Sequence, residues 1–179
     1  MRRILIVIVL SSFMTSVAGA TVLVPADLGE LSRDARAIAR GRIVALDAQW
    51  TDGRRGIETV VTLEAETYLK GNLGETVQFR VPGGSLGRFR NIVVGAPQFA
   101  VGQRVILFLG ARGPTVPFVL GLSQGVFRLA QNGGGDWMVT PPAVLPTMRG
   151  PIVRGNLTMR TAPLADFERE VRALTEVRP

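Results

Sequence analysis

Two long stretches of alternating residues constrain the fold of this chain more than any other feature. Residues 57–69 alternate between a face of apolar and threonine side chains and a more polar face, and residues 37–50 show the same period less regularly. A period of two is typical of a β-strand, in which successive side chains lie on opposite faces. A turn-forming sequence at residues 52–56 separates the two stretches, so we predict a long hairpin. Gly41 interrupts the first strand and predicts a bulge or a bend there.

Shorter strands are predicted along the rest of the chain. Residues 76–81 alternate in the same way and end at Pro82, which cannot donate a backbone hydrogen bond to a sheet. The apolar run within residues 104–109 is typical of a fully buried strand. Further short strands are expected at residues 91–94, 118–120, 125–129 and 137–139.

A helix is expected at each end of the folded region. Residues 27–35 begin with Asp27, which can cap a helix, and Glu30 follows at the spacing of a capping box. Residues 163–177 begin with a proline suited to a first helical turn, and they carry one apolar stripe. The order of elements predicts a mainly β domain that curls into a small Greek-key barrel of about six strands. The apolar stripe of the C-terminal helix consists of Leu164, Phe167, Val171 and Leu174.

Residues 1–20 have the features of a secretory signal peptide. Two arginines precede an apolar run at residues 4–10, and the small residues at 18–20 suit a signal peptidase. The run is shorter than the roughly 20 residues that cross a bilayer, so we expect cleavage before Thr21 and no stable membrane insertion afterwards. The mature chain, residues 21–179, has the length of a single domain, and we expect it to be periplasmic or secreted.

The chain contains no histidine and no cysteine, which excludes several kinds of catalytic and metal site. A Ser-His-Asp triad, a cysteine nucleophile and an imidazole- or thiolate-bound metal all need one of these residues. We therefore expect no metal and no cofactor. Residues 121–125 match the G-x-S-x-G pattern of a nucleophile elbow, but Ser123 has no histidine to take its proton. Because Lys70, the only lysine, falls in a predicted turn, we interpret this segment as a turn between strands.

Carboxylates leave one enzymatic alternative open. Glu64 and Glu66 share one face of the second long strand because side chains alternate with a period of two. Paired carboxylates perform acid–base chemistry or hold a hard cation, and they also form the solvent-facing side of many amphipathic strands. A carboxylate-dependent hydrolase or lyase acting on an envelope polymer would need two such groups about 5–10 Å apart in a cleft. The candidates are Glu58, Glu64, Glu66 and Asp136.

The Gly-rich segment at residues 82–95 is the best candidate for a binding loop. Its glycines let a backbone approach a ligand closely, and its arginines offer paired N–H donors to a carboxylate or a phosphate. A hairpin tip without a binding role is the alternative interpretation. The candidate binding residues are Gly84, Gly87, Arg88, Arg90 and Asn91.

Three short segments resemble the netrin-like module of tissue inhibitors of metalloproteinases. These are residues 37–44 (AIARGRIV), 67–71 (TYLKG) and 102–109 (GQRVILFL). The chain is also similar to uncharacterised bacterial secreted proteins that combine such a core with segments like residues 81–84 and 121–127. The resemblance implies an OB-fold, which makes the expected fold a small OB-like Greek-key barrel.

The same resemblance implies protease inhibition, but the chain departs from the inhibitors at a decisive residue. The mature N-terminus of those proteins is a disulfide-bonded cysteine whose amine and carbonyl chelate the zinc ion of the target. In this chain the predicted terminus is Thr21, and no cysteine is present. We therefore carry over no functional residue, and protease inhibition is an alternative by resemblance only.

The chain is basic, with a formal net charge of +7. This excess is consistent with a solvated surface or with a patch for an acidic protein or an anionic polymer. OB-folds often bind nucleic acids through stacking aromatics, but aromatic residues are only 6% of this chain, and export separates it from nucleic acid. We therefore predict a non-catalytic binding module exported to the bacterial envelope or the extracellular space. Its predicted partner is an envelope or extracellular protein or an anionic polymer, and not a nucleic acid.

Overall fold

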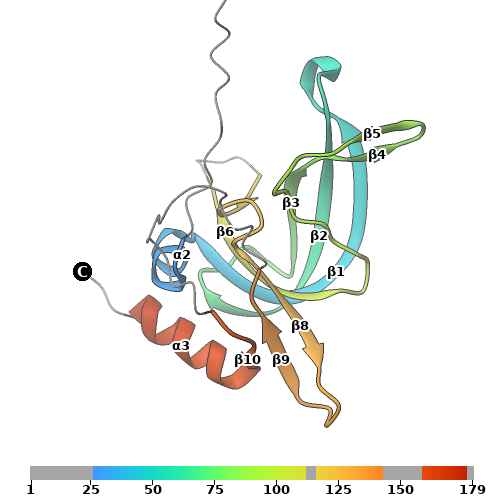
Figure 1. Ribbon diagram of the computed structural model, residues 1–179. Coiled ribbons are helices and arrows are strands. Elements are labelled where there is room, and N and C mark those ends of the chain that lie inside the picture. The colour runs from blue at the N-terminus through green and yellow to red at the C-terminus, as the bar shows by residue number, and fades with distance from the viewer. Residues whose placement is uncertain (1–25, 112–115, 143–158, 177–179) are drawn as a thin grey trace, which may run out of the picture.

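The computed structural model describes residues 26–111, 116–142 and 159–176 (Figure 1). The predicted signal peptide and its cleavage site lie outside the described residues. Within them the protein is mainly β, as the sequence predicts, with a short helix near the N-terminal end and a longer helix at the C-terminal end.

The helices are α2 (Leu28–Asp34) and α3 (Leu164–Glu176), and a 3-10 turn, Asp52–Arg54, joins the first two strands. The strands are β1 (Ala37–Trp50), β2 (Ile57–Lys70), β3 (Thr76–Pro82), β4 (Gly84–Leu86), β5 (Phe89–Asn91), β6 (Arg104–Gly110), β7 (Phe118–Val119), β8 (Val126–Gln131), β9 (Trp137–Thr140) and β10 (Ala162–Pro163). The described residues thus contain ten strands rather than about six. The difference arises because β4, β5 and β10 have two or three residues each, too few to show a period in the sequence. β7 corresponds to the short strand expected at residues 118–120.

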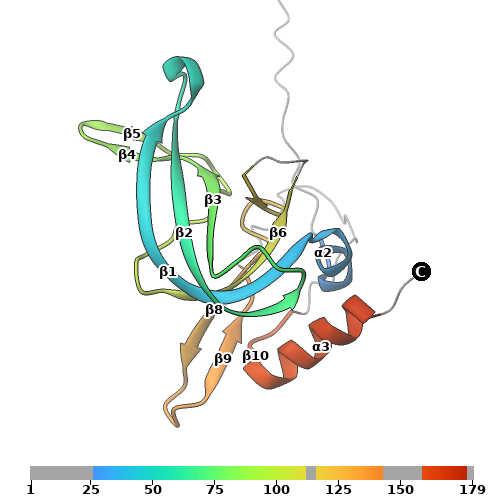
Figure 2. The same cartoon turned by 180° about the vertical axis from the view of Figure 1, so that it is seen from behind.

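Eight strands form one sheet in the order β1-β2-β3-β7-β6-β8-β9-β10, and β4 and β5 form a separate hairpin. β1 also pairs with β6. Each of the five strands β1, β2, β3, β7 and β6 therefore pairs with the next one in this order, and the last pairs with the first. We call these five strands the strand circuit. All of its pairs are antiparallel except β3 with β7, which run parallel and meet at Arg80 and Phe118. Figures 1 and 2 show that β1 and β2 curve and extend beyond the circuit. Both helices lie far from the turn that joins these two strands.

The curvature of β1 comes from irregular pairing with β2. The register between the two strands shifts three times, and one shift lies at Gly41, where the sequence predicts a bulge or a bend; the unpaired residue at this shift is Glu66 of β2. A side chain at this position would collide with the backbone carbonyl of Glu64 on β2. Another shift leaves Val44 as an extra residue of β1. Because bulges bend a strand and increase its twist, β1 pairs with β6 in its first half and leaves the circuit in its second half.

Apolar side chains fill both faces of β6, which is why this segment shows no alternation in the sequence. Val105 and Leu107 are fully buried in a cluster with Phe79 and other side chains of the strand circuit. Ile106 and Phe108 point the other way, into a second cluster that includes residues of both helices. The structure therefore confirms the predicted buried strand and shows that it joins two apolar clusters.

The amphipathic pattern of α3 is confirmed by its packing. Phe167 and Val171 are buried in the second cluster, and the other two residues of the predicted stripe pack against it. The helix begins at Leu164 rather than at Pro163, because Pro163 belongs to β10 and pairs with β9. Its predicted last residue, Val177, lies outside the described part of the chain. No helix in the described ranges is long and apolar enough to cross a membrane.

The strand predicted at residues 91–94 is wrong for most of its length. β5 ends at Asn91, and residues 92–96 form turns and irregular backbone. The apolar run Ile92–Val94 has the composition of a strand, but no neighbouring strand pairs with it. This segment instead forms part of a wall beside β1 and β2.

Both ends of α2 are capped. At its start, the Asp27 carboxylate accepts the N–H of Glu30 at 2.7 Å, and the Glu30 carboxylate accepts the N–H of Asp27 at 3.2 Å, which confirms the capping box. At its end, the Lys70 ammonium donates to the carbonyls of Ser32 at 2.7 Å and Arg33 at 2.9 Å. A cation is favourable at this end of a helix because the carbonyls and the helix dipole are negative there. The last residue of β2 thus fastens the strand to α2.

Replacing Lys70 with methionine is expected to lower the free energy of unfolding by about 1–2 kcal/mol, because two charge-assisted hydrogen bonds to helix carbonyls are lost. Urea denaturation followed by circular dichroism measures the change. Lys70→Arg, which keeps the charge and the donors, is the control and should lose less than half as much stability. Equal stability of the methionine variant and the native protein would contradict the capping role.

Candidate functional site

A pocket of about 340 Å³ lies where β1 and β2 extend beyond the strand circuit. Its floor comes from β1, β2 and β3, and its walls come from the β4–β5 hairpin and the loop at residues 92–99. The pocket is open to solvent, and apolar and polar atoms contribute to its lining in about equal measure. The floor residues are Leu46, Ala48, Thr59, Val61 and Val81.

Hydrogen bonds from both ends of the β4–β5 hairpin hold it over this floor. The N–H of Gly83 donates to the carbonyl of Ile57 at 2.8 Å, and the Thr59 hydroxyl donates to the carbonyl of Gly83 at 2.8 Å. At the other end, the Asn91 side chain donates to the same Ile57 carbonyl at 3.5 Å. The hairpin is therefore fixed against β2 on the side that faces the pocket.

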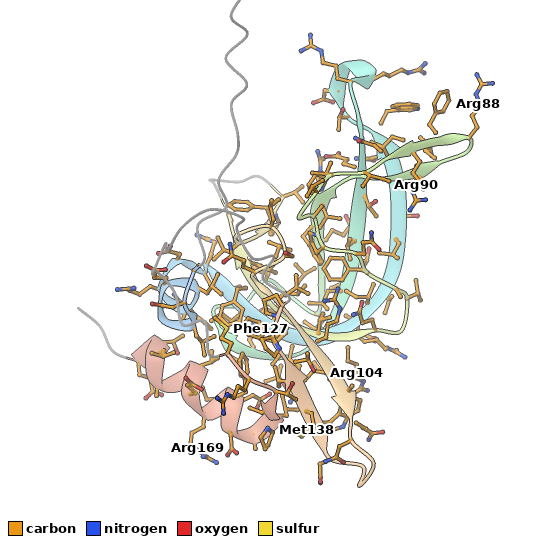
Figure 3. The ribbon with its side chains drawn as sticks, in the orientation of Figure 1. Arg88, Arg90, Arg104, Phe127, Met138 and Arg169 are labelled. Atoms are coloured by element: carbon orange, nitrogen blue, oxygen red, sulfur yellow. The ribbon has the colours of Figure 1, made fainter. Side chains whose placement is uncertain are left out.

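The structure separates the five predicted binding residues into two groups. Gly84, Arg90 and Asn91 line the pocket. Gly87 and Arg88 form the tip of the hairpin, and Figure 3 shows Arg88 pointing outward, away from the body of the protein. The prediction thus found one wall of the pocket and, next to it, an exposed tip.

The backbone structure itself requires glycine at Gly84 and Gly87, the two predicted binding glycines. A Cβ atom on Gly84 would lie 2.6 Å from the Thr59 hydroxyl, and Ala48 is also near, so the hairpin crosses the floor closely only with glycine there. Gly87 has a φ of +58° in the turn between β4 and β5, a conformation that favours glycine. At these two positions the backbone requires glycine whether or not a ligand binds.

Sequence reasoning missed most of the apolar lining. Ile92, Val93 and Phe99 come from the wall loop, and Ile92 and Val94 are 69% and 82% exposed. The one available signal was an apolar run, Ile92–Val94, inside a segment otherwise rich in glycine and arginine. Large exposed apolar side chains that gather beside a pocket are characteristic of a binding surface.

Four arginines surround the free ends of the two hairpins, and no described acidic side chain forms an ion pair with any of them. The hairpin ends are held together by Trp50 and Phe89, whose rings meet edge to face with centroids 5.2 Å apart. The guanidinium of one of these arginines lies 5.1 Å from the Phe89 ring centroid. This leaves a positive surface around the pocket. We name the four residues the arginine crown: Arg54, Arg55, Arg88 and Arg90.

The carboxylates of the enzymatic alternative lie away from this pocket. No Asp or Glu lines it, and Asp136 accepts a hydrogen bond from Asn132 within a turn. Within the described ranges, no group of three or more acidic, histidine or cysteine side chains is placed to hold a metal ion. The three glutamates are ion-paired: Glu58 with Arg80 at 3.1 Å, Glu64 with Arg42 at 2.9 Å, and Glu66 with Arg104 at 3.3 Å and Arg40 at 3.7 Å.

The G-x-S-x-G segment is a turn between β7 and β8, as predicted. The N–H of Gly125 donates to the carbonyl of Leu120 at 3.0 Å, and the N–H of Val126 donates to the carbonyl of Ser123 at 3.1 Å. A nucleophile elbow requires a helix after the serine, whereas β8 follows here. The Lys70 ammonium is engaged with the carbonyls of α2.

The pocket, its apolar wall and the arginine crown are therefore the features of this fold that most resemble a binding site. No protein-family model, no curated protein and no solved structure matches the chain.

Proposed function

We propose that this chain is an exported, non-catalytic binding module that takes its partner at the pocket beneath the β4–β5 hairpin. One observation carries the proposal: a pocket of about 340 Å³ with a mainly apolar floor has at its edge Arg90, which forms no ion pair with a described residue. Binding sites typically combine an apolar hollow with a few polar groups that orient the ligand. The partner is an envelope or extracellular protein or an anionic polymer.

We infer that the strand circuit is a small OB-like barrel. An OB-fold is a five-stranded, partly open Greek-key barrel. The circuit has five strands, and its narrowest link is the single pair between Arg80 and Phe118. OB-folds bind ligands across their second and third strands. β2 and β3 supply Thr59, Val61 and Val81 to the pocket floor, which supports the same use of the fold.

The non-catalytic part of the proposal rests on the side chains around the pocket. Its lining contains serine, glutamine, asparagine and arginine, but no carboxylate. The chain has no histidine or cysteine to serve as a base or a nucleophile. General acid–base and nucleophilic catalysis usually rely on these residue types. The lining is therefore better suited to binding than to bond cleavage.

The exported location rests on the sequence of residues 1–20. Mass spectrometry of the protein recovered from its own host tests this directly. We expect a mature N-terminus at Thr21 in the periplasmic or extracellular fraction. Full-length protein confined to the cytoplasm would reject export.

Filling the pocket tests the binding role. The side chain of Ala48 faces the pocket, so Ala48→Leu should reduce partner capture at least about tenfold, which corresponds to about 1.4 kcal/mol of binding free energy. Capture uses mature protein with a photoreactive amino acid at position 92, beside the pocket, irradiated in the envelope of its host at low and high salt. The captured molecule is then identified.

Gln49→Leu is the matched control because it introduces the same side chain on the same strand. Gln49 points to the other face of β1, where its amide donates to Glu58 at 2.8 Å. We expect this variant to capture the partner within about twofold of the native level, a difference of about 0.4 kcal/mol. Equal losses in both variants, or no discrete captured molecule at either salt concentration, would reject the pocket as the binding site.

A further inference from the structure

One edge of β1 is open beside the pocket. β6 pairs with this edge from Ala37 to Arg42, and the last two hydrogen bonds join Ile43 to Gln103 at 2.9 Å and to Gly102 at 2.7 Å. Beyond them no described strand pairs with this edge of β1, although β2 pairs with its other edge to the end. Exposed strand edges are ready to pair with another extended chain, and proteins usually cover them.

The residues whose backbone groups face this open edge include residues whose side chains line the pocket. The N–H of Thr51 donates to the carbonyl of Gly56 on the β2 side. Because hydrogen bonds alternate along an antiparallel pair, the N–H and C=O groups of Leu46, Ala48 and Trp50 point away from β2, toward the open edge. The side chains of Leu46 and Ala48 line the pocket. A strand added at this edge would therefore place alternate side chains over the pocket.

The arginine crown specifies the charge of such a strand. Asp52 is the one acidic residue within the turns that carry the crown, so four guanidinium groups face solvent with little local compensation. Arginine presents paired N–H donors that fit a carboxylate. The segments of this sequence that lie outside the described residues contain no Asp or Glu, so none of them offers a complementary acidic side chain. An acidic segment of another molecule would supply that charge.

We propose that the partner is an acidic, extended segment of another protein, which adds as a strand to the open edge of β1. This inference rests on the proposed function and names the partner class. Backbone pairing supplies affinity, an apolar side chain enters the pocket, and flanking carboxylates bind Arg88 and Arg90. An anionic polymer would form ion pairs with the arginines, but it would not pair with the strand edge or contact the apolar floor of the pocket.

Selection from a library of displayed random decapeptides provides the probe. Mature protein is the target, and the strongest selected peptide is synthesised with a fluorescent label for polarisation measurements. We expect selected sequences to carry apolar residues at alternate positions, Asp or Glu beside them, and no proline in the core. Selection of basic or proline-rich sequences would overturn the proposal.

N-methylation of the peptide backbone distinguishes strand addition from attraction by charge. Two peptides are compared, one methylated at the odd-numbered residues and the other at the even-numbered residues. One of them should bind at least about tenfold more weakly, because its methylated N–H groups are those that pair with β1, and the other should lose less than about threefold. Equal losses of affinity in the two methylated peptides would contradict strand addition. Dextran sulfate, a polyanion without amide groups, should compete less than about one tenth as well as the peptide on an equal charge basis.

The charge requirement is tested with Arg88→Gln combined with Arg90→Gln. This double variant should weaken the peptide at least about tenfold and reduce the salt dependence of binding. Arg36→Gln is the control, because Arg36 is exposed, forms no ion pair with a described residue and lies next to α2, at the other end of β1 from the crown. It should bind the peptide within about twofold of native protein.

The outcomes separate the two proposals. If dextran sulfate competes as well as the peptide and both lose affinity in the double arginine variant, the strand-addition inference fails while the pocket region remains the binding site. If peptides are selected but bind equally to native protein, to Ala48→Leu and to the double arginine variant, they bind elsewhere, and the proposed function fails as well. Self-association of the mature protein that requires the open edge would identify a second copy as the occupant and would reject an acidic partner.

Discussion

Phe127→Ala is expected to lower the free energy of unfolding by about 3–5 kcal/mol, the usual cost of removing a buried phenylalanine ring. Phe127 is 1% exposed and joins the two layers of the second apolar cluster. Its ring lies 5.3 Å from that of Phe108 on β6 and 4.8 Å from that of Phe167 on α3, centroid to centroid. The substitution opens a cavity between sheet and helix that neither neighbour can fill without leaving its own partners.

Chemical denaturation of the mature protein measures this loss. Phe89→Ala is the matched control, because Phe89 is 47% exposed and its ring meets the Trp50 ring and the Arg88 guanidinium at the surface. We expect the control to lose no more than about 1.5 kcal/mol, the upper value for an aromatic pair. If the two variants lost the same stability, Phe127 would not join α3 to the sheet. Because domains have about 5–15 kcal/mol of stability, Phe127→Ala should also leave a measurable fraction unfolded at elevated temperature.

The second large effect is expected at Gly41, where β1 leaves no space for a Cβ atom beside the backbone of β2. A Cβ atom there would collide with the backbone carbonyl of Glu64 and would lie 3.0 Å from the Cα atom of Ala65. Both are main-chain atoms of a strand that is paired on each side, so they cannot move as a side chain would. Gly41→Ala should therefore cost about 3 kcal/mol, the upper range for overpacking, even though alanine adds one carbon.

Gly133→Ala is the control for this substitution. Gly133 lies in the turn between β8 and β9, has no heavy atom within 4 Å of its ideal Cβ position and has an ordinary φ. Its unfolding free energy should change by less than about 0.5 kcal/mol, as at most surface positions. A Gly41→Ala variant as stable as this control would mean that β1 and β2 can separate at the bulge without cost.

The sequence predicted those elements whose side chains repeat over a whole segment. β1, β2 and β3 follow from their period of two, β6 from its apolar run, and α3 from its stripe. Asp27 and Glu30 located α2 through a local hydrogen-bond pattern. In each case the physical cause lies within one segment, where a single sequence displays it.

Features that depend on contacts between distant segments were not predicted. β10 exists because β9 offers it backbone partners, and nothing in two residues shows this. A short strand was expected at β7, but its parallel pairing with β3 was not. The candidate binding residues were found in part, since glycine and arginine mark a loop by composition. The pocket floor was missed because Leu46 and Val61 read as ordinary strand residues. They become a pocket only where β1 and β2 extend beyond the circuit.

The attachment of Lys70 to α2 has a practical consequence for finding the partner. Amine-directed crosslinkers react with lysine side chains and the N-terminus, and this chain has a single lysine. Lys70 ends β2, whereas Thr59 and Val61 of the same strand line the pocket, roughly 30–35 Å away along the strand at about 3.3 Å per residue. Its ammonium is also occupied by two helix carbonyls. At Lys70, amine chemistry would therefore react slowly and far from the arginine crown, so arginine-directed or photoreactive reagents are the appropriate choice.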